Sequence, residues 1–185
     1  TDTPHAAGAG ALRTAGGRIL RWGDDAQEAG LALRQADVVI DGIVGIGGSG
    51  ALRPDAAALV AAASDGEAIV VAVDVPSGVD ADSGVVTGAA VVADVTVTFG
   101  ALKPGLVVAP GALHSGTVRL VDIGLDFAEA ARAYVLEALD VAGWVAEPAP
   151  DAYKYRRGVV GVAAGSAAYP GAALLSTGAA RHANV

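Results

Sequence analysis

The stretch IVVAVDVPSGVDAD, Ile69–Asp82, contains the features that decide the fold. Its first part, Ile69–Val73, is apolar and mostly β-branched, which is typical of a central strand covered on both faces. The run stops at Asp74, and Pro76 lacks the N–H that a further ladder hydrogen bond would need. Open α/β sheets carry their functional groups at the carboxyl ends of their strands, so the pattern predicts a functional position for Asp74.

The same arrangement occurs upstream, where the apolar run Val38–Ile40 ends at Asp41 and is followed by the glycine-rich Gly45–Gly50. A strand-terminal aspartate can simply close an Asx turn, which is the alternative for each residue alone. Two of them on strands expected to be neighbours, with Ser77 beside Asp74, favour a functional site. Oxygen ligands without His or Cys would suit a hard cation.

Predicted strands and helices alternate over the first part of the chain, with connections long enough for parallel crossovers. The predicted strands are Arg18–Trp22, Asp37–Val44, Ile69–Asp74, Val91–Phe99 and Thr117–Ile123. The predicted helices lie within Thr1–Ala15, from Asp24 or Asp25 to Gln35, from Pro54 to Ala63, and over Asp126–Leu139. This order predicts an α/β fold with a mainly parallel sheet.

Composition excludes several classes of protein. Of the 185 residues, 53% are hydrophobic and 17% charged, which supplies a core and argues against disorder. The formal net charge of −8 argues against a nucleic-acid partner, which would need a basic face. The absence of Cys excludes disulfides and thiolate chemistry. No apolar run reaches the roughly 18 residues that span a bilayer, so no membrane partner and a cytoplasmic location are expected.

A second domain is predicted near the end of the chain. The Pro-rich Pro148–Pro150 resembles a linker, Val159–Ala164 resembles a buried strand, and Gly165-Ser166 leads to a helix that begins near Pro170. We therefore predict a first domain over residues 1–147, a linker over 148–157, and the first β-α unit of a second α/β domain over 158–185.

The loop Gly45-Ile46-Gly47-Gly48-Ser49-Gly50 satisfies G-x-G-x-x-G after a strand. In a dinucleotide fingerprint the third glycine lies in the first helical turn, whereas here Leu52-Arg53-Pro54 intervenes before the predicted helix. The sequence favours a loop whose backbone N–H groups contact phosphate in another geometry. Lys103, in a Lys-Pro-Gly turn after a strand, either lies on the functional edge or is a solvated turn lysine.

These motifs, in this order, resemble the YjeF N-terminal family of NAD(P)HX epimerases. The resemblance rests on DVVIDGIVGIGGSGALRP, AVDVPSGVDADSG, ADVTVTFGALKPGL and VRLVDIGL, and covers about Ala36–Leu125. The tail KYRRGVVGVAAGSAAYPGAALLS, Lys154–Ser176, is similar to the opening of ribokinase-like NAD(P)HX dehydratase domains. Their combination has the order of bifunctional nicotinamide-nucleotide repair proteins.

The resemblance implies a Rossmann-like three-layer α/β/α sandwich. It implies that Asp41 and Ser77 are potassium ligands, that Gly45–Ala51 (Gly45, Ile46, Gly47, Gly48, Ser49, Gly50 and Ala51) holds the hydrated dinucleotide, and that Asp74 is a substrate-binding and catalytic residue. It assigns no role to Lys103. The implied substrate is NADHX or NADPHX, the implied cofactors are K⁺ and, for the dehydratase, ADP or ATP with Mg²⁺, and the full-length protein is expected to form a homo-oligomer.

One family motif, an Asn-Asn-Gly-Gly-Asp loop that grips phosphate, has no counterpart in these residues. The chain is therefore expected to be an internal fragment, inactive by itself. Two alternatives to an epimerase stay open. The same fold serves as a non-catalytic scaffold in an mRNA-decapping factor, and the glycine motif would suit a generic Rossmann dinucleotide-binding protein.

Overall fold

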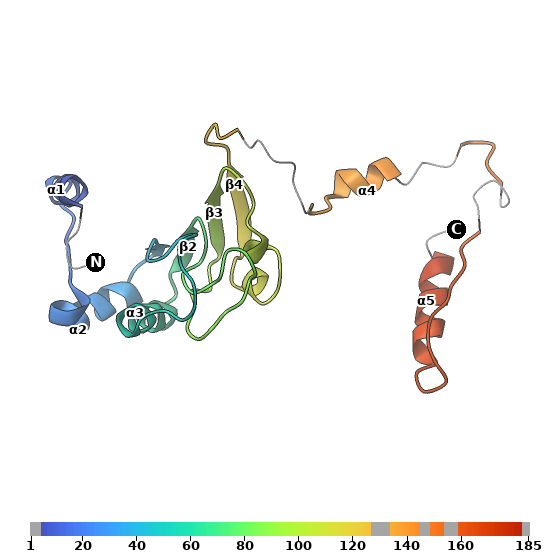
Figure 1. The fold of residues 1–185 in the computed structure, drawn as a ribbon, viewed down its shortest axis with the longest axis horizontal. Helices are drawn as coiled ribbons and strands as arrows, with labels where there is room; N and C mark the ends of the chain where they lie inside the picture. The colour runs from blue at the N-terminus through green and yellow to red at the C-terminus, as the bar shows by residue number, and fades with distance from the viewer. Residues whose placement is uncertain (1–4, 127–133, 145–148, 154–158, 183–185) are drawn as a thin grey trace. The chain divides into compact units, whose positions relative to one another are not determined.

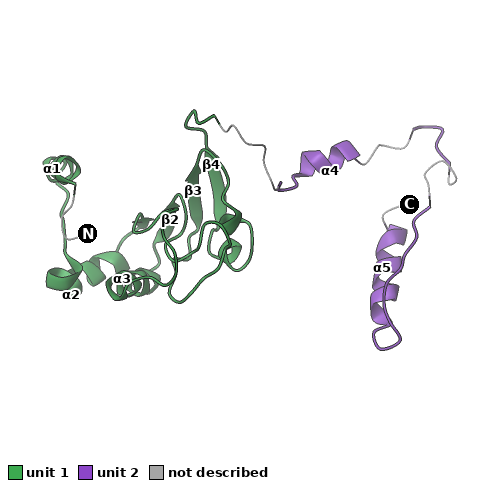
Figure 2. Cartoon of the chain, viewed as in Figure 1, with its two compact units in different colours: residues 1–130 green, residues 131–185 purple. Residues whose placement is uncertain are grey.

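The computed structural model of the chain describes residues 5–126, 134–144, 149–153 and 159–182. They fall into two compact units, residues 1–130 and 131–185 (Figure 2). The domain boundaries predicted at residues 147 and 158 stay a prediction. No helix among the described residues has the length and apolar character that a membrane crossing requires.

A four-stranded sheet forms the centre of the first unit (Figure 1). The strands lie in the order β1 (Val38–Asp41), β2 (Ile69–Val73), β3 (Val95–Phe99) and β4 (Thr117–Val121). Every neighbouring pair is parallel, so the carboxyl ends of all four strands meet at one edge of the sheet. This arrangement confirms the predicted α/β, Rossmann-like class.

Helix α3 (Pro54–Ser64) connects β1 to β2 and packs on one face of the sheet. Pro54 occupies the first helical turn, where its missing N–H has no intrahelical partner to lose. Val60 of α3 forms a buried cluster with Ala72, Val91 and Ala93. Helix α2 (Trp22–Arg34) packs against α3, beside it in Figure 1, and α1 (Ala6–Thr14) precedes both.

Turns and short 3₁₀ helices cover the rest of that face. Residues 74–94 connect β2 to β3, and η1 (Pro104–Leu106) and η2 (Gly111–Leu113) lie between β3 and β4. Val75, Val79, Ala81 and Leu106 form a second buried cluster, against which Val118 of β4 packs. The turns after β2 are therefore packed parts of the structure.

The opposite face of the sheet is more exposed. Along β3 the buried Thr96 and Thr98 alternate with half-buried neighbours, and on β1 and β2 Ile40 and Ile69 are 70% and 54% exposed. Their neighbours Val39 and Val70 point to the covered side. The second helical layer of the predicted sandwich would lie on this exposed face, because parallel sheets are normally covered on both sides.

Several expectations about the first unit are wrong. Arg18–Arg21 form no strand, and α2 starts at Trp22, before the expected caps Asp24 and Asp25. Ile19, Leu20 and Trp22 are the only large apolar residues there, too short a run to compete with the helix that follows. The predicted strand Val91–Phe99 begins only at Val95, because Val91 and Ala93 pack into the cluster under α3.

The second unit contains α4 (Ala138–Trp144) and α5 (Gly171–His182). The helix predicted near Pro170 is confirmed by α5, but the predicted strand Val159–Ala164 is not formed, and Val159 is 93% exposed. A strand requires a neighbour to take its backbone hydrogen bonds, and none of the described residues of this unit supplies one. Of the helix predicted over Asp126–Leu139, residues 127–133 lie outside the described residues and residues 134–137 are not helical, so only its last two residues coincide with α4.

Candidate active site

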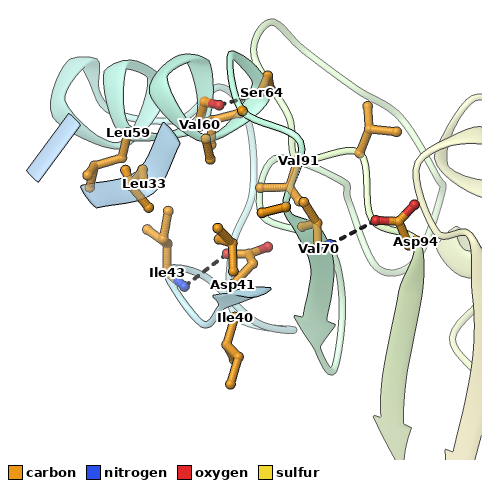
Figure 3. Close-up of a pocket in the computed structure, with 15 residues that line it drawn as sticks. Leu33, Ile40, Asp41, Ile43, Leu59, Val60, Ser64, Val70, Val91 and Asp94 are labelled. Carbon is orange, nitrogen blue, oxygen red and sulfur yellow. Dashed lines mark hydrogen bonds between the residues drawn. The ribbon is translucent and has the colours of Figure 1, made fainter. Parts of the chain in front are cut away.

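The carboxyl end of β1 is joined to the turn after β2 by Asp41 and Ser77. Asp41 is 4% exposed and Ser77 is fully buried. Asp41 Oδ2 accepts from the Ser77 N–H at 2.7 Å, and Oδ1 accepts from the Ser77 hydroxyl at 2.7 Å and from the Ile43 N–H at 3.2 Å (Figure 3 shows the Ile43 contact). The Asx turn at Asp41 and the contact with Ser77 are therefore both present.

Ser77 also holds the start of the glycine loop. Its Oγ accepts from the Val44 N–H at 3.0 Å, and the Val44 carbonyl lies 3.3 Å from the same atom. Hard cations prefer oxygen ligands, and a carboxylate, a hydroxyl and a carbonyl oxygen lie close together here. These residues therefore fit the predicted potassium ion. Among the described residues there is no metal-binding group of three or more His, Asp or Glu side chains, and this set includes one carboxylate.

The carboxyl end of β2 is Asp74, which has a φ of +71°. Its N–H donates to the Val97 carbonyl at 2.7 Å, and the Val75 N–H reaches the Val73 carbonyl at 3.0 Å, closing a three-residue turn around it. A positive φ at a residue other than glycine costs about 1–3 kcal/mol and is concentrated at functional positions. The strained backbone turns the Asp74 side chain toward β3.

Three donors converge on one oxygen of Asp74. Oδ1 accepts from Lys103 Nζ at 2.6 Å, from Thr98 Oγ1 at 3.2 Å and from the Phe99 N–H at 3.4 Å. Oδ2 lies on the side of Gly45, where a Cβ would be 3.9 Å away. Asp74 therefore has one oxygen engaged by the protein and a second directed toward the beginning of the glycine loop.

The glycine loop borders a pocket of about 360 Å³. Five of the predicted loop residues line it, namely Gly47, Gly48, Ser49, Gly50 and Ala51; Gly45 and Ile46 do not, and neither does Asp74. Arg53, directly before α3, and Asp80 contribute charged groups to the lining. The helix begins after the loop, as the intervening Leu52-Arg53-Pro54 predicts, and this departs from the dinucleotide fingerprint.

A local turn stabilises the ionised form of Asp80. The Ser83 hydroxyl donates to Asp80 Oδ1, as does the Ser83 N–H at 2.9 Å, and these hydrogen bonds hold the pKa of the Asp80 carboxyl below its usual value. Arg53 and Asp80 thus give the pocket one positive and one negative side chain. Hydrogen bonding to the charged form is the cause of the lowered pKa.

A larger pocket of about 450 Å³ lies between the sheet and α3 (Figure 3). Its wall is mainly aliphatic, including Leu33, Leu59 and Val91. Its two carboxylates are already hydrogen-bonded to backbone, Asp41 to Ile43 and Asp94 to the Val70 N–H at 2.8 Å. A mainly apolar wall without Lys or Arg does not suit a multiply charged dinucleotide, so we place the candidate site at the glycine loop.

The structure thus brings the predicted residues together in two adjoining groups, Asp41 with Ser77 and Asp74 with Gly45. Sequence reasoning missed Thr98 and Arg53 and left Lys103 undecided. Lys103 is a partner of Asp74, with only 16% of its side chain exposed. Its place after a strand end was a signal, but the sequence does not show how the Lys-Pro-Gly turn folds back.

A parallel α/β sheet with acidic side chains and a glycine loop at its carboxyl edge is typical of Rossmann-like proteins. The family described as "YjeF-related protein N-terminus" matches residues 3–105. The chain belongs to this family. The match includes the ends of β1 and β2, the glycine loop and Lys103.

Curated relatives agree with this family. The chain is 49% identical over 179 residues to the "Bifunctional NAD(P)H-hydrate repair enzyme Nnr" of Mycobacterium leprae, which covers 97% of this chain and 35% of that protein. The protein of the same name from Mycobacterium tuberculosis is 48% identical with the same coverage. An "NAD(P)H-hydrate epimerase" from Clavibacter sepedonicus is 51% identical over 115 residues, 58% of this chain and 50% of that protein. The chain thus spans about a third of the length of the two mycobacterial relatives.

Proposed function

We propose that this chain carries part of an NAD(P)H-hydrate epimerase site, which interconverts the R and S forms of NADHX or NADPHX. The observation that supports this most is the arrangement of Asp74. Its Oδ1 is held by Lys103 and Thr98, and its Oδ2 is directed toward the glycine loop. The names of the relatives and the family match point to the same activity.

The glycine loop would hold the phosphates of the dinucleotide. Backbone N–H groups of a glycine-rich loop bind anions without a side chain in the way. Arg53 adds a positive charge to the pocket, and it precedes the N-terminus of α3, where backbone N–H groups also favour anions. These groups would offset the acidic character of a chain whose net charge is −8.

Asp74 would carry out the proton transfers. In the hydrated nicotinamide ring, the ring nitrogen can supply an electron pair that expels the C6 hydroxyl, which takes a proton and leaves as water. The resulting iminium is cationic, and a carboxylate beside it stabilises that charge. Water then adds to either face of C6 and releases a proton, so one group that delivers and accepts a proton suffices.

Asp41 and Ser77 would hold a potassium ion. Bound there, the ion supplies a positive charge next to a buried carboxylate. The two residues already connect the end of β1, the turn after β2 and Val44, the residue directly before the glycine loop. Ion binding at these oxygens would therefore stabilise the loop that precedes the pocket.

The test is Asp74→Asn in the full-length protein, with R-to-S conversion followed by NMR or chromatography. Asn tolerates a positive φ and has nearly the same shape, so the fold should persist while the proton acceptor is lost. We expect the rate to fall by at least about 100-fold, the usual share of general acid–base catalysis. Glu67→Gln, at an exposed position, is the control. An unchanged rate in Asp74→Asn would remove Asp74 from the mechanism, whereas no conversion by the unmodified full-length protein would favour the non-catalytic scaffold.

For the longer protein, we propose a second activity, the dehydration of S-NAD(P)HX with ADP or ATP and Mg²⁺. Its support is that the bifunctional relatives align with 97% of this chain. The measurement is ADP- or ATP-dependent recovery of NADH absorbance from NADHX by the full-length protein. We also propose that the full-length protein forms a homo-oligomer, and light scattering of the same preparation measures its molar mass.

A further inference from the structure

The ammonium group of Lys103 has three oxygen partners. Its Nζ lies 2.6 Å from Asp74 Oδ1, 2.9 Å from Thr98 Oγ1 and 2.9 Å from the Phe99 carbonyl. An ammonium has three N–H donors, so these contacts use all of them. We infer that Lys103 is a positioning residue, which orients the Asp74 carboxylate for epimerisation without touching the substrate. This inference rests on the proposed function of Asp74.

The fold brings Lys103 to Asp74 through a rigid turn. Pro104 fixes the backbone after Lys103, and the Gly105 N–H donates to the Ala81 carbonyl at 2.7 Å. A Cβ at Gly105 would collide with the Asp80 carbonyl, so only glycine lets the turn lie this close to the segment after β2. The Lys103 side chain then points back along the end of β3 to Phe99 and Thr98.

Asp74 needs such a partner because its own backbone does not hold the carboxylate in place. The residue follows the last residue of β2 at a φ of +71°, and although its N–H still donates to Val97 of β3, its side-chain torsions are fixed only by contacts. Lys103 and Thr98 both engage Oδ1, and Thr98 in turn lies within hydrogen-bond distance of Lys103. This closed network leaves Oδ2, on the side of Gly45, as the oxygen that can meet the substrate.

A solvated turn lysine is the competing explanation, and burial argues against it. The side chains of Lys103 and Asp74 are 16% and 19% exposed. Exposed ion pairs contribute little, whereas a pair removed from water with further hydrogen bonds loses much when one partner is removed. The contact with the Phe99 carbonyl also fixes the ammonium at the end of β3, where a freely solvated lysine would not be held.

The test is Lys103→Met in the full-length protein, assayed for R-to-S conversion at varied substrate concentration. We expect kcat to fall about 100-fold, the effect of misplacing a catalytic group by about 1 Å. KM should stay within about 2-fold, because a residue that does not touch substrate does not remove ground-state binding. Arg119→Met, which removes a positive charge at an exposed position on β4, is the control and should keep the full rate.

Thr98→Val provides a second variant that leaves Lys103 in place and nearly preserves volume at a buried position. It removes one donor to Asp74 Oδ1, so kcat should fall by a smaller factor, again without a change in KM. In Lys103→Ala, added ethylammonium should restore part of the rate, because a small cation can enter the vacated space. A purely structural lysine would not give this rescue.

The outcomes separate this inference from the proposed function. An unchanged kcat in Lys103→Met, with a lost rate in Asp74→Asn, would overturn the positioning role and leave the epimerase proposal standing. A raised KM with unchanged kcat would overturn it too, since Lys103 would then bind substrate directly. If Lys103→Met does not fold, an unchanged kcat in Thr98→Val overturns the inference. An unchanged rate in Asp74→Asn would remove Asp74 from the mechanism and the positioning role of Lys103 with it, whereas no conversion by the unmodified full-length protein would remove the proposed function itself.

Discussion

Ser77 donates both its backbone N–H and its hydroxyl to the carboxylate of Asp41, each at 2.7 Å, across 36 positions of sequence. The pair joins the end of β1 to the turn after β2, and both residues are buried. The start of the glycine loop depends on this junction, because Ser77 also accepts a hydrogen bond from the Val44 N–H, directly before Gly45.

Asp41→Ala should remove the potassium dependence of epimerisation. We expect the unmodified full-length protein to be faster in K⁺ than in Na⁺, and the variant to show the same low rate in both. The substitution also leaves the Ser77 and Ile43 donors without an acceptor, which costs about 1–3 kcal/mol for each donor that stays buried. Initial rates in the two salts and thermal unfolding are the measurements.

Equal rates in K⁺ and Na⁺ before any substitution would contradict the potassium assignment. Glu67→Ala is the matched control, because it removes one carboxylate at an exposed position. It should alter neither the salt preference nor the melting temperature.

Two glycines at this edge should respond to alanine in opposite ways. Gly78 has a φ of +96°, and a Cβ there would lie 2.5 Å from the Ala89 carbonyl oxygen, so Gly78→Ala should lower the free energy of unfolding by more than about 1 kcal/mol. At Gly47 no atom lies within 4 Å of the added Cβ. Gly47→Ala should therefore keep the stability.

Gly47→Ala tests the loop as a binding site. The methyl group would enter open space in the pocket, where the proposed phosphates approach the backbone, so KM should rise about 10-fold. Gly10→Ala, at a position in α1 with no atom within 4 Å of the added Cβ, is the control for the substitution itself. A KM equal to that of the unmodified protein would place the dinucleotide elsewhere.

Ser83→Ala should raise the pKa of the Asp80 carboxyl toward the ordinary aspartate value, because the Ser83 hydroxyl bond to the charged form is lost. Since the folded pKa lies below the unfolded one, the stabilisation by this turn is present above the unfolded pKa and disappears as the pH falls through the folded value. The variant should lose that part of the acid dependence. A carbon-detected NMR titration of Asp80 measures the pKa directly, and an unchanged value would contradict the role of Ser83.

The sequence predicts some elements well because the deciding interactions are local. Ile69–Val73 is a strand as predicted, since a β-branched run that ends before Pro76 has few alternatives. Helix α3 begins at Pro54 as predicted, because proline suits the first turn of a helix. Arg18–Trp22 and Val159–Ala164 fail because a strand depends on a partner, and neither segment has one among the described residues.

One part of the candidate site can be predicted from the sequence and another part cannot. Parallel pairing of β1 with β2 places Asp41 near the turn that holds Ser77, so topology alone brings them together. The contact of Lys103 with Asp74 spans 29 positions and depends on Gly105 packing against the backbone of the segment after β2. No periodicity in the sequence encodes that approach, and the positive φ of Asp74 is equally invisible there.

The chain of 185 residues by itself should show neither activity. Its glycine loop and Asp74 are present, but the phosphate-gripping Asn-Asn-Gly-Gly-Asp loop of the family has no counterpart in the sequence. An acidic protein that binds a multiply charged anion with fewer donors should bind it weakly. Exposed apolar residues on β1 and β2, such as Ile40 and Ile69, should also make the isolated chain prone to association.

Limited proteolysis and an activity assay of the isolated chain test this expectation. We expect the first cuts within Glu147–Arg157, a segment that includes the Pro-rich linker, and a remnant that ends near Trp144. Neither helix of the second unit contains a buried residue, so that unit has little packing to resist further digestion. Epimerase turnover by the isolated chain would show that the donors around Asp41, Asp74 and the glycine loop suffice for binding and chemistry, and it would contradict the need for a further phosphate-binding loop.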